Sequence, residues 1–115
     1  MLRKHRENAD YYIERLQGLP KLQLLDYKSD RLSSYWLFTV RARERLFFMQ
    51  KMKEAGITVS QVHSRNDMHT MFKDFRRVLP GVDEFIDEQV SIPVGWWLTE
   101  QEREHIADTV VKICK

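Results

Sequence analysis

The chain has 115 residues, 43% of them hydrophobic and 31% charged, which fits one soluble globular domain with a single core. Its 19 basic and 17 acidic residues are interleaved and leave a formal charge of +2, so the charge pattern does not indicate a nucleic-acid partner. The one cysteine, Cys114, excludes an internal disulfide, and without an apolar run of roughly 18 residues or a signal-peptide-like start we expect a cytoplasmic chain with no membrane partner.

The first predicted element is a helix over residues 2–16, where apolar residues recur at i, i+4 and i+7 and charged residues occupy the other side. Gly18 ends this helix. Two short apolar runs follow, over residues 22–25 and 35–40, and a polar segment over residues 27–33 joins them. We expect these runs to form two strands connected by a loop.

The next predicted elements are a helix over residues 42–55 and a strand over residues 57–62. Four positions are expected to form one face of the helix: Ala42, Leu46, Met49 and either Met52 or Lys53. The adjacent Phe47 and Phe48 blur this register, and Gly56 occupies the position that caps a helix C-terminus. The β-branched, apolar run after the helix predicts a strand that is reached by a crossover connection.

Three further short elements are predicted in the last third of the chain. Asn66 or Asp67 is expected to cap a short helix over residues 68–75, because its side chain can accept hydrogen bonds from free backbone N–H groups. Residues 82–88 are expected to form another helical turn or two. Residues 90–92 then form a predicted fourth strand.

The end of the sequence carries the clearest signals. Pro93 indicates that the fourth strand lies at an edge of the sheet, and Thr99 with Glu102 forms a capping box before a final amphipathic helix that contains Ile106. Together the elements predict one domain over residues 1–115 of the α+β (α/β-like) class, with a small, mainly antiparallel sheet and helices on one face.

Four polar residues, His63, Arg65, Asn66 and Asp67, form the first candidate site. Arg65 is suited to grip a phosphate or carboxylate through two parallel hydrogen bonds, and His63 to exchange a hydrogen bond with a substrate hydroxyl near neutral pH. A structural role is equally compatible with these residues, with Asn66 or Asp67 as a helix cap and Arg65 in a salt bridge. The residues alone leave both interpretations open.

Two pairs of aromatic residues form the second candidate site: Tyr35 with Trp36, and Trp96 with Trp97. Gly95 permits a tight turn before the second pair. Successive residues of a strand face opposite ways, so we expect one ring of each pair in the core and the other at an interface or cleft.

Other chemistries find little support in the sequence. His63 and His69 lie six positions apart, a spacing that matches no zinc-ligand motif, so no metal site is predicted. Ser64 lacks the neighbouring glycines of a nucleophile elbow, and the four glycines are isolated, so neither a hydrolase triad nor a phosphate loop is predicted. We therefore expect no catalytic residue, metal or cofactor in this chain alone.

Several segments occur in a familiar order. They include Ser34-Tyr-Trp-Leu-Phe38, Lys53-Glu-Ala-Gly-Ile57, the loop from His63 to Asp67, and Ile92-Pro-Val followed by Leu98-Thr99. Their order and spacing resemble the C-terminal (small) domain of the DegT/DnrJ/StrS family of pyridoxal-phosphate (PLP)-dependent sugar aminotransferases.

This resemblance implies the small-domain fold of fold-type I PLP aminotransferases and a role in amino-sugar or cell-surface polysaccharide biosynthesis. In such enzymes a lysine of the large domain holds PLP, and that domain is absent here, so the chain is not expected to be catalytic alone. Its expected partner is the large PLP-binding domain or chain. The small domain would wall the cleft for a nucleotide-linked keto sugar, with His63, Arg65, Asn66 and Asp67 nearest to it.

The alternative is a non-catalytic binding or protein-interaction domain that keeps the fold. The aromatic pairs would then contact a protein partner, or a second copy of the chain in a homo-oligomer.

Overall fold

The computed structural model describes residues 1–26 and 28–115, so the predicted polar segment over 27–33 begins at a residue, Tyr27, that lies outside the described residues. At the centre is a three-stranded antiparallel sheet of order β1-β2-β3. Its strands are β1 (Leu22–Leu24), β2 (Phe38–Ala42) and β3 (Gln89–Ile92). The middle strand pairs with both neighbours, placing Val40 opposite Leu24 on one side and opposite Val90 on the other.

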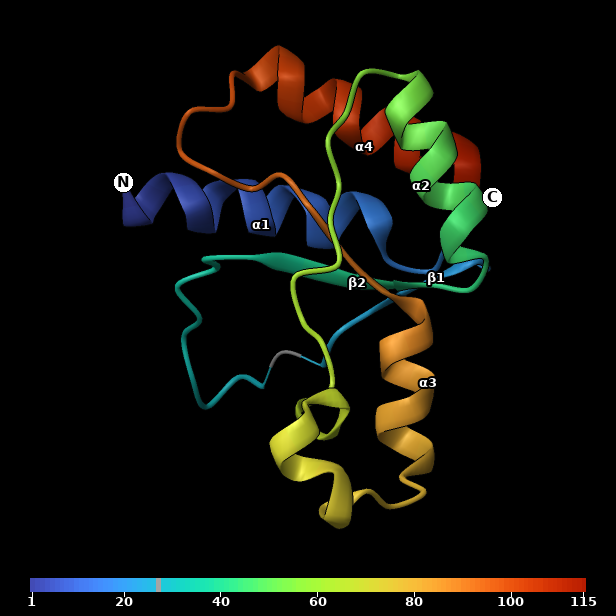
Figure 1. Ribbon diagram of the computed structural model, residues 1–115. Helices are drawn as coiled ribbons and strands as arrows, with labels where there is room; N and C mark the ends of the chain where they lie inside the picture. Colours follow the sequence, from blue (N-terminus) through green and yellow to red (C-terminus); the bar gives the residue numbers. More distant parts are fainter. Residues whose placement is uncertain (27) are drawn as a thin grey trace.

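Helices lie on both sides of this sheet, but unequally (Figure 1). One side carries α1 (Leu2–Leu16), α2 (Arg45–Glu54) and α4 (Glu100–Cys114). The other side carries α3 (Pro80–Glu88) and two short 3-10 helices, η1 (Asn66–Met68) and η2 (Thr70–Phe75). The predicted class, α+β with a small antiparallel sheet, is confirmed, but the expected placement of helices on one face holds only for α1, α2 and α4.

The core lies between the sheet and the layer formed by α1 and α4. Tyr12 and Leu16 of α1 and Val110 of α4 are fully buried there, as the apolar spacing of the two helices predicts. The Tyr12 and Phe38 rings meet edge to face with their centroids 5.3 Å apart, which is a favoured geometry for an aromatic pair. On the opposite face of β2, Thr39 Oγ1 and Ser91 Oγ are hydrogen-bonded at 3.0 Å.

Polar side chains of α1 hold the segment that follows β3. The buried Asn8 amide donates to the carbonyl oxygens of Val94 and Gly95 at 3.1 and 3.0 Å, and Tyr12 Oη donates to the carbonyl of Pro93 at 2.7 Å. At these residues the chain has left the sheet, so no strand donates hydrogen bonds to their carbonyl oxygens. Side chains from α1 donate those hydrogen bonds instead. Burial raises the pKa of the Tyr12 hydroxyl well above its usual range, which keeps it a hydrogen-bond donor.

Several predicted helix boundaries agree with the structure. The capping box of α4 is present, with Thr99 Oγ1 accepting from the Glu102 N–H at 3.1 Å and the Glu102 carboxylate accepting from the Thr99 N–H at 2.8 Å. Gly56 follows α2 with a left-handed φ of 78°, as the capping position requires. Pro80 starts α3 two residues before its predicted beginning, since proline fits the first position of a helix.

The second predicted strand is shifted. Tyr35 has a left-handed φ of 49°, which turns the chain ahead of the strand, so Tyr35 and Trp36 precede β2 instead of starting it. The strand then continues to Ala42, and α2 begins only at Arg45. The predicted face of α2 is therefore correct at Met52, which is fully buried, and wrong at Leu46, which is 76% exposed while Phe48 points into the core instead.

The predicted third strand over residues 57–62 and its crossover connection are also wrong. Within that segment only Ser60 pairs with the sheet, through an isolated antiparallel bridge to Ser91. Ile57 instead packs into the core directly after Gly56. The predicted helix over 68–75 is divided between η1 and η2, and neither has a side-chain cap, because Asn66 and Asp67 lie within η1 and the N-cap positions are Arg65 and His69.

The anchoring role of Asn8 predicts a large effect of its removal. Asn8→Ala leaves two buried carbonyl groups without donors, and we expect the free energy of unfolding to fall by about 2 to 3 kcal/mol in urea denaturation. The matched control is Glu7→Ala on the same helix, where the exposed carboxylate makes only long ion pairs. Its effect should stay within about 0.5 kcal/mol. Equal effects of the two substitutions would contradict the anchoring role.

Candidate functional site

A groove opens at the end of the sheet where the chain leaves β3. It has a volume of about 310 Å³, and we call it the tryptophan groove. The residues that line it are Trp36, Leu37, Thr58, Ser60, Ser91, Ile92, Pro93, Val94, Gly95 and Trp97. Three segments that are distant in sequence meet here: the segment before β2, the chain after α2, and the chain after β3.

The exposed indole rings of Trp36 and Trp97 form the rim of this groove, and the exposed Trp96 ring lies against that of Trp97. Trp36 is 72% exposed, Trp97 63% and Trp96 52%. The expectation that one of Trp96 and Trp97 fills the core is therefore wrong, because the backbone leaves β3 before reaching them. For the other pair the expected division holds, with Tyr35 buried and Trp36 at the surface.

Gly95 provides the seat for the Trp97 ring. A Cβ atom added to Gly95 would collide with the six-membered part of that ring, so only glycine permits this position. The ring also meets His5 of α1 edge to face, with the centroids 6.3 Å apart. Trp96 stands against it in a similar geometry at 6.2 Å.

The segment that carries Trp36 is tied to the same helix. His5 Nδ1 lies 3.0 Å from the Tyr35 carbonyl oxygen, and Arg6 Nε donates to the Ser33 carbonyl at 3.0 Å. Both sides of the tryptophan groove are thus positioned by the first half of α1.

The polar cluster predicted from the sequence lies on the loop after Ser60. Arg65 and Asp67 are joined by two hydrogen bonds of 2.8 and 2.7 Å, and Arg65 is also paired with Asp83 of α3. The His63 and Asn66 side chains are exposed. The salt bridge expected for Arg65 is therefore present, the expected helix cap from Asn66 or Asp67 is not, and His63 and Asn66 face solvent.

Electrostatics tie this loop to its neighbours. The two hydrogen bonds from Arg65 hold the pKa of the Asp67 carboxyl below its usual range, and the nearby Arg76 acts in the same direction. Arg76 Nε also donates to the Asp67 carbonyl oxygen at 2.6 Å. At the base of the loop, the buried Gln89 side chain donates to the His63 carbonyl at 2.7 Å and so fixes where the loop starts.

Sequence reasoning missed several residues of these sites. Asp83 had no local signal beyond being an acidic residue near the start of a helix, and its pairing with Arg65 depends on the tertiary fold. Thr58, Ser60 and Ser91 line the tryptophan groove, but their hydroxyl groups are common in any loop or strand. The sequence signal that did point to this groove was Gly95 directly before Trp96 and Trp97.

The arrangement is suited to binding. Indole faces stack on flat or apolar groups, and hydroxyl and carbonyl groups exchange hydrogen bonds with polar ones. In the described part of the chain no group of three or more His, Cys, Asp or Glu side chains could hold a metal ion. In that same part, no helix combines the length and apolar character that crossing a membrane requires.

The fold of this chain is shared by solved structures. It matches the sugar aminotransferase CalS13 from Micromonospora echinospora with a TM-score of 0.93 and 40% sequence identity, over 97% of this chain and 30% of that chain. It matches AtS13 from Actinomadura melliaura with a TM-score of 0.91 and 46% identity, over 96% of this chain and 30% of that one.

DesV from S. venezuelae, solved with a ketimine intermediate, has a TM-score of 0.92 at 21% identity, which shows the fold alone. It is covered over 32% of its length, against 99% of this chain. A search of curated proteins gives no match.

The sequence model of the DegT/DnrJ/EryC1/StrS aminotransferase family matches residues 1–111. The chain therefore belongs to this family, as its sequence motifs suggested. It spans about 30% of the length of the sugar aminotransferases that it matches.

The seat of Trp97 gives a prediction about Gly95. In Gly95→Ala the ring has to swing away, so we expect the nuclear Overhauser effects between the Trp97 and His5 rings to disappear. Gly81→Ala is the control, because nothing lies within 4 Å of its added Cβ. It should keep those effects and raise the free energy of unfolding by about 0.5 to 1 kcal/mol. Unchanged ring contacts in Gly95→Ala would contradict the proposed seat.

The Arg65–Asp67 pair gives a prediction about pH. Because the folded pKa of Asp67 is lowered, the pair stabilises the loop above the ordinary carboxyl pKa, and this contribution is lost as pH falls through the lowered value. Arg65→Gln should raise the Asp67 pKa toward its ordinary range, measured by carboxyl carbon NMR titration. Arg77→Gln, whose exposed guanidinium donates to the Arg76 carbonyl, should leave it lowered. A lowered pKa that survives in Arg65→Gln would show another cause.

Proposed function

We propose that this chain is the C-terminal domain of a PLP-dependent nucleotide-sugar aminotransferase and acts with a large domain that carries the PLP lysine. The observation that carries this proposal is the family match over residues 1–111, together with the share of about 30% that the chain covers in CalS13 and AtS13. On this view the activity belongs to the complete enzyme, and the chain alone has no catalytic residue.

The lysines of the chain support this division. A lysine that forms a Schiff base needs burial or a nearby positive charge, which lowers the pKa of its amine. Seven of the eight lysines are exposed, and the half-buried Lys51 has its amine 3.1 Å from the Glu54 carboxylate. These residues do not fit a PLP-holding site, which we assign to the large domain.

The tryptophan groove supports a role as one wall of a cleft. Large apolar side chains exposed together at one end of a domain are typical of a surface that meets another domain or a ligand. We propose that Trp36, Trp96 and Trp97 face the large domain, with Tyr35 supporting Trp36 from below. In that position the indoles would exclude water from the cleft that receives a nucleotide-linked keto sugar.

The loop after Ser60 has two parts in this proposal. His63 and Asn66 are assigned to substrate contact, because their side chains are exposed. Arg65 and Asp67 are assigned to the same substrate-binding loop, where their mutual ion pair positions its backbone. The setting we propose is cytoplasmic synthesis of amino sugars for cell-surface polysaccharides.

The proposal predicts that this chain restores the activity of a truncated relative. CalS13 without the region that this chain matches should lack aminotransferase activity, and adding this chain should return it, because the two folds agree closely. Trp36→Ala combined with Trp97→Ala should lower the restored activity by about tenfold, since buried aromatic residues dominate interfaces. Leu46→Ala, an exposed apolar residue of α2, is the control and should have no effect.

Two results would count against this function. Truncated CalS13 that is active alone would show that the domain is dispensable. A chain that binds truncated CalS13 without restoring activity would favour the second candidate, a protein-interaction domain, which the exposed tryptophan rim also supports. As a check on the chain itself, incubation with PLP and borohydride should leave no stoichiometric lysine adduct.

A further inference from the structure

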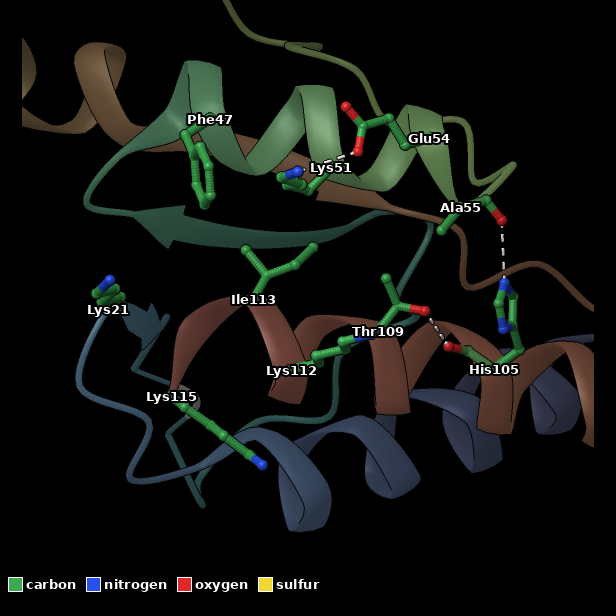
Figure 2. A pocket seen from close by; sticks show the side chains of 10 residues that line it. All are labelled: Lys21, Phe47, Lys51, Glu54, Ala55, His105, Thr109, Lys112, Ile113 and Lys115. Atoms are coloured by element: carbon green, nitrogen blue, oxygen red, sulfur yellow. Dashed lines mark hydrogen bonds and ion pairs between the residues drawn. The ribbon is translucent and has the colours of Figure 1, made fainter.

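A second groove lies between α2 and α4, and Figure 2 shows the side chains that line it. Its volume is about 660 Å³, roughly twice that of the tryptophan groove. In Figure 1, α2 stands at the end of the molecule marked C, opposite the end marked N. We call this second groove the α2/α4 groove. Its lining residues are Lys21, Phe47, Lys51, Glu54, Ala55, His105, Thr109, Lys112, Ile113 and Lys115.

The two walls of the α2/α4 groove repeat the same helical spacing. On α2 the lining begins at Phe47 and continues at i+4, i+7 and i+8; on α4 it begins at His105 and continues at i+4, i+7 and i+8. Each wall is therefore one continuous helix face about 12 Å long. Two such faces side by side form a trough that matches the ridge of a third helix.

The floor of the groove is apolar. Phe47 of α2 and Ile113 of α4 point toward each other across it in Figure 2. Phe47 remains 47% exposed, although the adjacent Phe48 is fully buried in the core. This explains the blurred register seen in the sequence: α2 has two apolar faces, and only one of them is covered by this chain.

The rim of the groove is basic. Four lysines and one glutamate line it, a formal surplus of three positive charges in a chain whose total is +2. The glutamate is already paired with Lys51 at 3.1 Å, which leaves Lys21, Lys112 and Lys115 to attract anions. At one end His105 Nε2 donates to the Ala55 carbonyl at 3.1 Å and joins the two helices.

We propose that the α2/α4 groove is a docking site for an acidic amphipathic helix of a partner protein. The apolar side of that helix packs on Phe47 and Ile113, and carboxylates on its flanks pair with the lysines of the rim. Charge complementarity selects an acidic partner, and the paired helical walls select a helix. This interaction is separate from the tryptophan groove and independent of the aminotransferase proposal.

The test uses a fluorescein-labelled peptide of about 15 residues, with leucine at every third or fourth position and glutamate on the flanks. We expect saturable, salt-sensitive binding by fluorescence anisotropy, with amide NMR shifts concentrated in residues 47–55 and 105–113. A scrambled peptide of the same composition and a leucine-free glutamate peptide should bind at least about tenfold more weakly, since neither presents an apolar helix face.

Charge reversal gives the matched pair of variants. Lys21→Glu with Lys112→Glu should weaken binding about tenfold, because both lysines line the groove and Glu54 is paired with Lys51 instead. Lys53→Glu with Lys73→Glu changes the net charge equally at exposed positions outside the groove, and should weaken binding less than about threefold. Phe47→Ala tests the apolar floor and should weaken binding without loss of helical circular dichroism.

Three results would overturn the proposal: equal binding of the scrambled or leucine-free peptide, equal effects of the two charge-reversed variants, or NMR shifts located around the tryptophan groove. Concentration-dependent self-association that the Lys21/Lys112 variant abolishes would also overturn it, because the occupant would then be a second copy of the chain.

Discussion

Three hydrogen bonds from α1 to the segment after β3 organise this domain. Asn8 and Tyr12 bind consecutive carbonyl groups of residues 93–95, just where β3 loses its strand partner. Asn8 also accepts a hydrogen bond from Arg103 of α4 at 3.3 Å, so the first and last helices are joined through the same side chain. Without these donors the chain beyond Ile92 would have buried backbone groups that nothing satisfies.

The functional surface follows from that constraint. Because α1 fixes residues 93–95, Gly95 is held where the Trp97 ring can lie on it, and Trp96 and Trp97 are directed outward. The same helix also fixes the segment that carries Trp36. The buried Asn8 amide and the buried Tyr12 hydroxyl therefore define the shape of this surface from beneath.

Local signals in the sequence predicted local structure well. The Thr99–Glu102 box and the apolar spacing of α1 act within a few residues, and both elements formed where expected. The errors arose where contacts between residues distant in sequence determine the local structure. The β-branched run over residues 57–62 has the composition of a strand, but it meets the sheet at Ser60 alone.

The candidate site was predictable in part for the same reason. The motifs identified the family and drew attention to the loop and the aromatic pairs. They gave no information on Asp83, which lies in α3, 18 positions after Arg65, and forms an ion pair with the Arg65 guanidinium. The left-handed backbone of Tyr35 was equally hidden, because a tyrosine rarely adopts that conformation and no residue preference announces it.

The bridge between Ser60 and Ser91 has a consequence for how such domains diversify. Two backbone hydrogen bonds of 3.2 and 2.8 Å close the chain on itself, and the segment between them leaves the sheet at Ser60, forms η1, η2 and α3, and rejoins the sheet in β3. Segments with closely spaced ends tolerate changes in length and sequence. Mutation can therefore reshape the segment over residues 61–88 while the register of the three strands stays intact, so surface shape and foldability depend on separate parts of one small chain.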